Sequence, residues 1–175
     1  CHNLDALGVD SGLLSIIGND ETANDLRALL KNLKIDSDYL VTDASASTIS
    51  KDRVLTESQQ ICRIDYEKKL NEFSNEAFEL FYDNFSRSTN KFDGIILEDY
   101  SKGVLNNKSI QRLIHLSKES GQFIAVDPGK GKPALWYRGA NLLKPNLSEA
   151  KSLIYSMGYE KCSLDMMGEI LMDKL

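Results

Sequence analysis

The chain has 175 residues and a net charge of −5, and 42% of its residues are hydrophobic. These values are typical of a globular chain, and the acidic balance argues against a module that holds nucleic acid through phosphate contacts. No apolar run approaches the ~20 residues that a membrane-spanning helix needs, and no signal-peptide pattern opens the chain. Three widely spaced cysteines, Cys1, Cys62 and Cys162, favour a reduced cytoplasmic protein over a disulfide framework or a zinc site.

Both ends of the chain interrupt a pattern. Residues 2–8 are typical of the end of a helix that stops at Gly8. Residues 164–175 are still an amphipathic helix where the sequence ends. We therefore expect the chain to be an internal stretch of a longer protein.

The first half predicts two buried strands, a helix and a hairpin. Short apolar runs at 13–17 and 39–41 are typical of buried strands, and between them Asp20 caps a helix from Glu21 to about Leu33. Residues 48–55 and 60–66 partly alternate around a turn at 56–58, which predicts a β-hairpin. Its polar strands favour a flap or small second sheet outside the main sheet, with Cys62 as a small buried residue.

The second half alternates helices with apolar strands. A helix over 74–85 precedes a strand at 94–97, and Asn106 caps a helix that runs to about Glu119. Strands follow at 122–126 and 140–144, and Asn146 opens another helix. This order predicts an α/β fold, a mostly parallel sheet flanked by helices on both faces.

Polar side chains follow three of these strands. Parallel sheets bind ligands beyond the carboxyl ends of their strands. Carboxylates, lysines and helix N-termini at one edge suit a phosphorylated ligand with a magnesium ion. The residues at the three strand ends are Glu98, Asp99, Lys102, Asp127, Lys130, Lys132, Lys144, Asn146 and Glu149.

A structural interpretation competes with each of these assignments. Asp99 and Asp127 also fit ordinary polar residues at the end of a strand. Asn146 with Glu149 fits a capping box. The loop lysines fit a solvated surface. His115 is better explained as a surface or packing residue than as a catalytic one, and the segment 136–137 as a packing plug.

Several familiar motifs are absent. The sequence has no G-x-G-x-x-G after a strand and no G-x-x-x-x-G-K-[ST], which argues against a dinucleotide-binding oxidoreductase and a Walker-type nucleotide site. It also lacks G-x-S-x-G and H-E-x-x-H.

Together, the segments resemble the ribokinase-type (PfkB) carbohydrate kinase family in order and spacing from about residue 3 to about 155. The segments Gln-Gln-x-x-Arg-x-Asp and Asp-Tyr-x-Lys-Gly are most similar to the kinases that phosphorylate D-glycero-D-manno-heptose 7-phosphate at the anomeric position, a step toward ADP-heptose for lipopolysaccharide. The Asn-x-x-Glu motif is shared more widely across the family. The segments that carry the resemblance are 47–55, 59–67, 99–103, 127–128, 137–140 and 143–150.

The resemblance implies a ribokinase-like fold in which residues 47–66 form a small β lid over the sugar. It implies ATP and Mg²⁺ as cofactors, with Asp127, Lys130, Asn146 and Glu149 at the nucleotide phosphates, and the last two also near magnesium, indirectly. It places Asp99 and Lys102 at the rim of the active site. Lid residues would bind the sugar phosphate, since arginine binds phosphate in a bidentate way. These residues are Lys51, Arg53, Gln60 and Arg63. The alternative for them is ion pairing within the hairpin, for instance Arg63 with Asp65.

Two family motifs have no counterpart within residues 1–175. The resemblance therefore implies that these residues are the central part of a single sugar-kinase domain. The glycine-rich sugar-binding segment is expected before Cys1. The Gly-x-Gly-Asp motif, whose aspartate is the catalytic base, is expected after Leu175. We therefore expect no catalytic base and no turnover from these residues alone. The segment Asp127-Pro128-Gly129-Lys130 also has one glycine more than the Asp-Pro-Lys of close relatives.

The expected partners are a sugar phosphate and ATP, without nucleic acid or membrane. Family relatives often dimerise through the lid, so the strands at 48–66 are a candidate homodimer interface. Two other functions stay open at this point: another sugar or nucleoside kinase of the family, and a non-catalytic binding module with the same fold. The sequence also leaves open whether a nucleotidyl-transferring domain follows.

Overall fold

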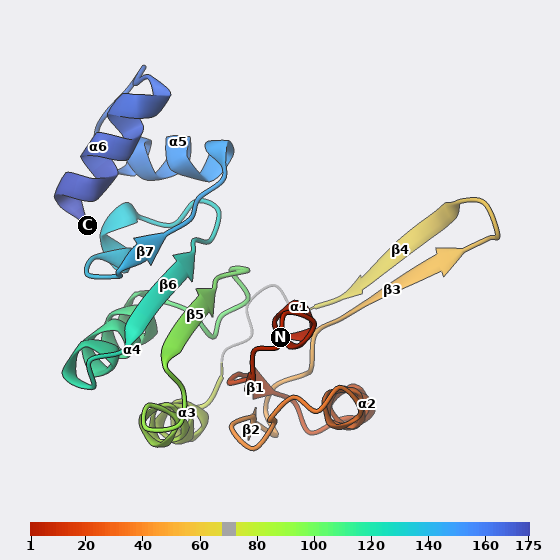
Figure 1. Ribbon diagram of the computed structural model, residues 1–175. Helices are drawn as coiled ribbons and strands as arrows, with labels where there is room; N and C mark the ends of the chain where they lie inside the picture. Colours follow the sequence, from red (N-terminus) through yellow and green to blue (C-terminus); the bar gives the residue numbers. More distant parts are fainter. Residues whose placement is uncertain (68–72) are drawn as a thin grey trace. The chain divides into compact units, whose positions relative to one another are not determined.

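The computed structural model describes residues 1–67 and 73–175, in two compact units, Cys1–Phe85 and Ser86–Leu175 (Figure 1). None of the helices in these described ranges is long and apolar enough to cross a membrane.

Unit 1 is built around a short parallel strand pair and one capped helix. Its strands β1 and β2 pair in parallel, with Ile16 opposite Val41. Both are shorter than predicted: Leu13 N donates to Asp36 O outside the β1–β2 ladder, and Leu40 N donates to Ser37 O. The elements are α1 (His2–Asp5), β1 (Ile16–Ile17), α2 (Glu21–Asn32), β2 (Val41–Thr42), β3 (Ser50–Leu55), β4 (Gln60–Tyr66) and α3 (Asn75–Ser88), which ends in unit 2.

The core of this unit lies under α2. Apolar residues recur at helical spacing along α2 and turn one face toward the strands. Leu13, Leu26 and Leu33 complete the core at its edge. Its buried residues are Ile17, Ala23, Leu30, Ile35 and Leu40.

Asp20 joins the start of α2 to the start of the hairpin. Its Oδ1 accepts a hydrogen bond from Ala23 N at 2.9 Å, which confirms the predicted cap. Its Oδ2 accepts from Thr48 N at 2.8 Å, and Thr48 Oγ1 in turn accepts from Gly18 N at 2.9 Å. A Cβ on Gly18 would lie 2.8 Å from both Ala46 O and Thr48 N, so this close approach requires glycine.

The predicted hairpin is confirmed as a separate antiparallel sheet of β3 and β4. Thr56 N donates to Gln59 O and closes the turn, and the register shifts between Val54 and Leu55. Both strands are exposed along almost their whole length. The prediction that Cys62 is buried is therefore wrong: this residue is exposed. A two-stranded hairpin has no second layer under which a small side chain can be enclosed.

Unit 2 is a three-stranded parallel sheet with strand order β5-β6-β7, which confirms the α/β prediction. The predicted cap at Asn106 is also confirmed, as a capping box with Ser109. The elements are β5 (Gly94–Glu98), α4 (Asn107–Glu119), β6 (Phe123–Asp127), the 3₁₀ helix η1 (Ala134–Tyr137), β7 (Leu142–Leu143), α5 (Leu147–Ser156) and α6 (Leu164–Lys174).

The two faces of this sheet differ. Helix α4 packs against β6, and on this face Leu97, Ile124 and Val126 are buried. The strand register places Ile96, Ala125 and Leu142 together on the other face. There Ile96 is 53% exposed and Leu142 is 49% exposed. Among the described residues of unit 2, the helices thus leave one apolar face of the sheet uncovered.

Replacing Asp20 tests its double role. Asp20→Ala removes the acceptors of both Ala23 N and Thr48 N, and we expect it to lower the free energy of unfolding of unit 1 by about 1–2 kcal/mol. Asp20→Asn keeps a capping oxygen and loses the second acceptor, so its effect should be smaller. Hydrogen exchange in the full-length protein, measured by mass spectrometry, reports the first loss at the α2 amides and the second at the Thr48 amide. Equal protection in Asp20→Ala and wild type would contradict the assignment.

The same carboxylate gives a pH dependence. The hydrogen bond from Thr48 N, opposed by burial, lowers the pKa of Asp20 below its usual value. Its stabilisation is therefore present above the unfolded pKa of about 3.9 and is lost as the pH falls through the folded pKa. Asp20→Asn should flatten the acid limb of thermal unfolding, whereas Asp25→Asn, exposed on the same helix, should not.

Candidate functional site

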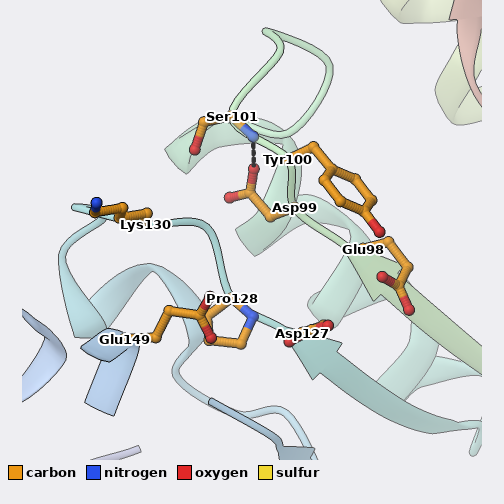
Figure 2. Close-up of a pocket in the computed structure, with 8 residues that line it drawn as sticks. All are labelled: Glu98, Asp99, Tyr100, Ser101, Asp127, Pro128, Lys130 and Glu149. Carbon is orange, nitrogen blue, oxygen red and sulfur yellow. Dashed lines mark hydrogen bonds between the residues drawn. The ribbon is translucent and has the colours of Figure 1, made fainter. Parts of the chain in front are cut away.

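An open pocket of about 310 Å³ lies at the carboxyl ends of β5 and β6 (Figure 2). The parallel pairing places Glu98 directly opposite Asp127, the last residues of the two strands. Two carboxylates thus sit side by side at the sheet edge where ligands of parallel sheets bind. The lining residues are Glu98, Asp99, Tyr100, Ser101, Asp127, Pro128, Lys130 and Glu149.

Asp99 lines this pocket but is held inside the protein. It is only 8% exposed, and its two carboxylate oxygens have separate donors. Oδ1 accepts from Ser101 N at 2.8 Å, and Oδ2 accepts from the Tyr137 hydroxyl at 2.9 Å. Asp99 therefore borders this pocket, with its carboxylate occupied by the surrounding protein.

Tyr137 was missed as a member of this site. The sequence suggested a packing plug at 136–137, and the ring of Tyr137 is indeed buried at 1% exposure. Its hydroxyl, however, donates to Asp99 and accepts from Gly129 N at 2.9 Å. Burial, and next the negative charge of Asp99, raise the pKa of Tyr137, so this hydroxyl keeps its proton.

The additional glycine in the 127–130 segment has a structural reason. A Cβ on Gly129 would lie 2.7 Å from Asp99 Oδ2 and 2.8 Å from Ser101 Oγ. The two loops therefore pass so closely that no larger residue fits between them. Lys130 follows directly and lines the pocket, where its side chain is exposed.

The third strand end contributes through a helix cap. Asn146 Oδ1 accepts from Glu149 N at 3.0 Å, and Glu149 Oε2 accepts from Asn146 N at 2.8 Å. The predicted capping box is confirmed. Because the cap points Glu149 into the pocket, the structural and functional interpretations of this motif are compatible.

Two predicted lysines do not line this pocket. Lys144 Nζ lies 3.8 Å from Asp127 Oδ2, a long and exposed ion pair that contributes little to stability. Lys102 follows Ser101 on the same loop, half-buried and outside the pocket lining.

The hairpin strands carry most of their charges on one face, with Asp52 on the other. Alternation and register place Lys51 and Arg53 on the same side as Asp65 and Arg63, with Arg53 directly opposite Arg63. Lys51 Nζ lies 3.3 Å from Asp65 Oδ2, and Arg63 Nε lies 2.9 Å from Asp65 Oδ1. The alternative of ion pairing within the hairpin therefore holds for Lys51 and Arg63, while Gln60 lies at the irregular end of the ladder.

The other face of the hairpin is largely apolar, although Asp52 lies on it opposite Ile64. Val54 is paired with Cys62, and Ile64 and Tyr66 follow on the same side. All four side chains are exposed. The four predicted lid residues belong to unit 1, whereas all eight pocket residues belong to unit 2.

The carboxylates of the pocket suit a cation that is shared with a bound phosphate ligand. Within residues 1–67 and 73–175, no three histidine, cysteine or carboxylate side chains come together as a metal site. Magnesium commonly binds one or two carboxylates and completes its shell with water and phosphate oxygens. Asp127 and Glu149 offer that chemistry.

His115 is exposed and pairs with Glu119 at 3.3 Å, as expected of a surface residue.

Comparisons with known proteins agree with this architecture. The chain is 38% identical over 149 residues to Bifunctional protein HldE of Sulfurimonas denitrificans, covering 85% of this chain and 31% of that protein. It is 35% identical over 150 residues to Bifunctional protein HldE of Aliarcobacter butzleri, covering 86% and 31%. The chain thus spans about a third of the length of these curated relatives.

Solved structures show the same fold at low sequence identity. A PfkB protein from Polaromonas sp. JS666 matches with a TM-score of 0.73 and 13% identity over 98% of this chain and 60% of that one. The tetrameric inhibited form of phosphofructokinase-2 from Escherichia coli matches with a TM-score of 0.71 and 17% identity, over 99% and 56%. The model of the pfkB family carbohydrate kinases matches residues 1–158. On this match, the chain belongs to the pfkB family of carbohydrate kinases.

Proposed function

We propose that the protein is an ATP-dependent kinase that converts D-glycero-D-manno-heptose 7-phosphate to the 1,7-bisphosphate, a precursor of ADP-heptose and lipopolysaccharide. The observation that carries the proposal is the pocket at the ends of β5 and β6, in a chain of the pfkB family. The subfamily segments and the relatives named Bifunctional protein HldE support the heptose phosphate as the sugar. The three free cysteines support a cytoplasmic location.

The pocket suits nucleotide phosphates bound with magnesium. Its carboxylates, Glu98, Asp127 and Glu149, would repel a bare triphosphate, so a phosphate ligand needs a cation between itself and them. When bound, Mg²⁺ would neutralise charge on the phosphates. Asp127 and Glu149 would face it, Asn146 would act indirectly through the cap, and Lys130 would pair with a phosphate oxygen.

The charged face of the hairpin suits the 7-phosphate of the sugar. Two arginines directly opposite each other repel, and an anion between them removes that repulsion. Arg53 makes no ion pair with any described residue, so its guanidinium is available. Asp65 would hold Lys51 and Arg63 in place beside it, and Gln60 would add a hydrogen bond.

We propose that the reaction also uses residues beyond those described. The anomeric oxygen attacks the γ-phosphorus, the bond from the γ-phosphorus to the bridging oxygen breaks, and ADP leaves while a base takes the hydroxyl proton. We propose that this base lies after Leu175 and that residues 1–175 are the central part of a single kinase domain. The exposed apolar face at Ile96 and Leu142 supports this, since parallel sheets are covered on both faces.

We also propose that two copies of the protein meet through the apolar face of the hairpin. A two-stranded hairpin is marginally stable in water without a packing partner. Val54, Ile64 and Tyr66 provide an apolar surface that a second copy would cover.

The substrate is tested by ADP release from the full-length protein. We expect release with D-glycero-D-manno-heptose 7-phosphate and none with ribose or fructose. Release only with another sugar would keep the kinase activity and reject the heptose phosphate. A folded protein that binds ATP and phosphorylates no sugar would instead be a binding module. Purified residues 1–175 should show no turnover, and measurable phosphorylation by them would place the base within this chain.

The role of Arg53 is tested by kinetics of the full-length protein. Arg53→Ala should raise KM for the sugar phosphate roughly tenfold to a hundredfold and leave KM for ATP nearly unchanged, because a charge-assisted pair to the phosphate is lost. Arg53→Lys should recover part of the loss, since lysine keeps the charge without the planar fork. Asp52→Asn, on the other face of β3, is the matched control. An equal rise in both KM values would reject the assignment.

The proposed dimer is tested by sedimentation velocity. Ile64→Lys places a charge in the apolar face and should give a monomer at concentrations where wild type is dimeric. Ser58→Lys adds the same charge at the turn and should leave the dimer intact. A dimer that withstands Ile64→Lys would place the interface elsewhere.

A further inference from the structure

One buried hydroxyl joins the two loops that border the pocket. The Tyr137 hydroxyl donates to Asp99 Oδ2 and accepts from Gly129 N, each at 2.9 Å. Asp99 belongs to the loop after β5, and Gly129 belongs to the loop after β6. Tyr137 itself comes from η1, which follows the loop after β6 and packs against α4 and α5.

The two loops are shaped to meet at this point. Ser101 adopts a φ of 56°, a left-handed conformation that is uncommon for serine. On the same loop, the Ser101 amide donates to Asp99 Oδ1. On the facing loop, any side chain at Gly129 would collide with the Asp99 carboxylate. Strain and close approach of this kind persist only where the surrounding structure fixes them.

The bridge leaves Asp99 and Tyr137 little capacity for a ligand. Both Asp99 oxygens already accept hydrogen bonds, and the Tyr137 hydroxyl both donates and accepts. Lys130, by contrast, follows Gly129 directly and is the lysine among the residues that line the pocket. Fixing the Gly129 amide therefore fixes the backbone from which the Lys130 side chain starts.

We propose that Tyr137 is a positioning residue: by clamping the Gly129 amide against Asp99, it sets the place of Lys130 in the pocket and thereby the affinity for nucleotide phosphates. This inference rests on the proposed kinase function of the pocket. Tyr137 touches neither nucleotide nor sugar and acts through the loop after β6.

Tyr137→Phe in the full-length protein tests the clamp, because it removes the hydroxyl and keeps the ring. Hydrogen exchange of the segment 128–133 should become faster, since Gly129 N loses its acceptor. Tyr155→Phe is the matched control, the same change at an exposed tyrosine of α5. Unchanged exchange in Tyr137→Phe would overturn the clamp, whether or not the protein phosphorylates a sugar.

Steady-state kinetics test positioning against a merely structural role. Tyr137→Phe should raise KM for MgATP roughly tenfold, with kcat changed less than about threefold. In a Lys130→Ala background the same change should add less than about twofold, because the two residues act through one contact. Equal effects in both backgrounds would mean that Tyr137 acts independently of Lys130 and would overturn the proposal.

Gly129→Ala provides a second variant in case Tyr137→Phe fails to fold. It pushes the two loops apart without touching the tyrosine, and it should give the same rise in KM for MgATP. Gly168→Ala in α6, where a Cβ meets open space, is its matched control. Wild-type KM in Gly129→Ala would overturn the proposal. A wild-type protein that binds MgATP and phosphorylates no sugar would reject the proposed function, while the clamp would still be decided by hydrogen exchange.

Discussion

The parallel register of β5 and β6 is the constraint on which the pocket depends. It brings Glu98 and Asp127 side by side, and Asp99 N extends the ladder by donating to Asp127 O at 3.0 Å. Because side chains alternate along a strand, Glu98 faces the open side of the sheet and Asp99 faces the buried side. One strand end thus supplies an exposed carboxylate that faces the pocket and a buried carboxylate that holds its frame.

Charge separates these two kinds of carboxylate. Asp99 is satisfied by donors from its own loop and from η1, so it needs no cation. Glu98 and Asp127 are partly solvated, and the nearest ammonium to Asp127 is the exposed Lys144. Under the proposed function, these solvated carboxylates and the capping carboxylate of Glu149 are the ones that a magnesium–phosphate ligand would meet. The difference between the buried and the solvated carboxylates follows from their geometry. It cannot be read from the residue types, because all of them are acidic.

Local patterns predicted the parts of this fold that depend on local chemistry. The caps at Asp20, Asn106 and Asn146 and the hairpin turn each lie within a few residues of their partners, and the structure has them where the sequence placed them. Contacts distant in sequence were missed. The hydrogen bond between Tyr137 and Asp99 spans 38 residues, and no local sequence pattern near either residue predicts it. Single-sequence patterns carry no information about such pairs.

The burial of the hairpin side chains and the lengths of the strands were the properties least predictable from the sequence. An alternating strand implies one covered face only when another layer lies beside it, so Cys62 was misjudged. The apolar run at 13–17 predicted one strand, but its first part bonds to Asp36 outside the ladder. In both cases the tertiary neighbours decided the outcome, and the residue types did not reveal them.

The attachment of Thr48 has a consequence for how the hairpin moves. Its amide is bound to Asp20 and its hydroxyl to Gly18, so the chain is fastened to the start of α2 at this point. A swing of the hairpin relative to α2 that keeps both bonds would therefore turn about the backbone between Thr48 and Ser50, the first residue of β3. The first strand of the hairpin therefore begins two residues after the fixed point at Thr48, and the carboxylate that caps α2 also holds that point in place.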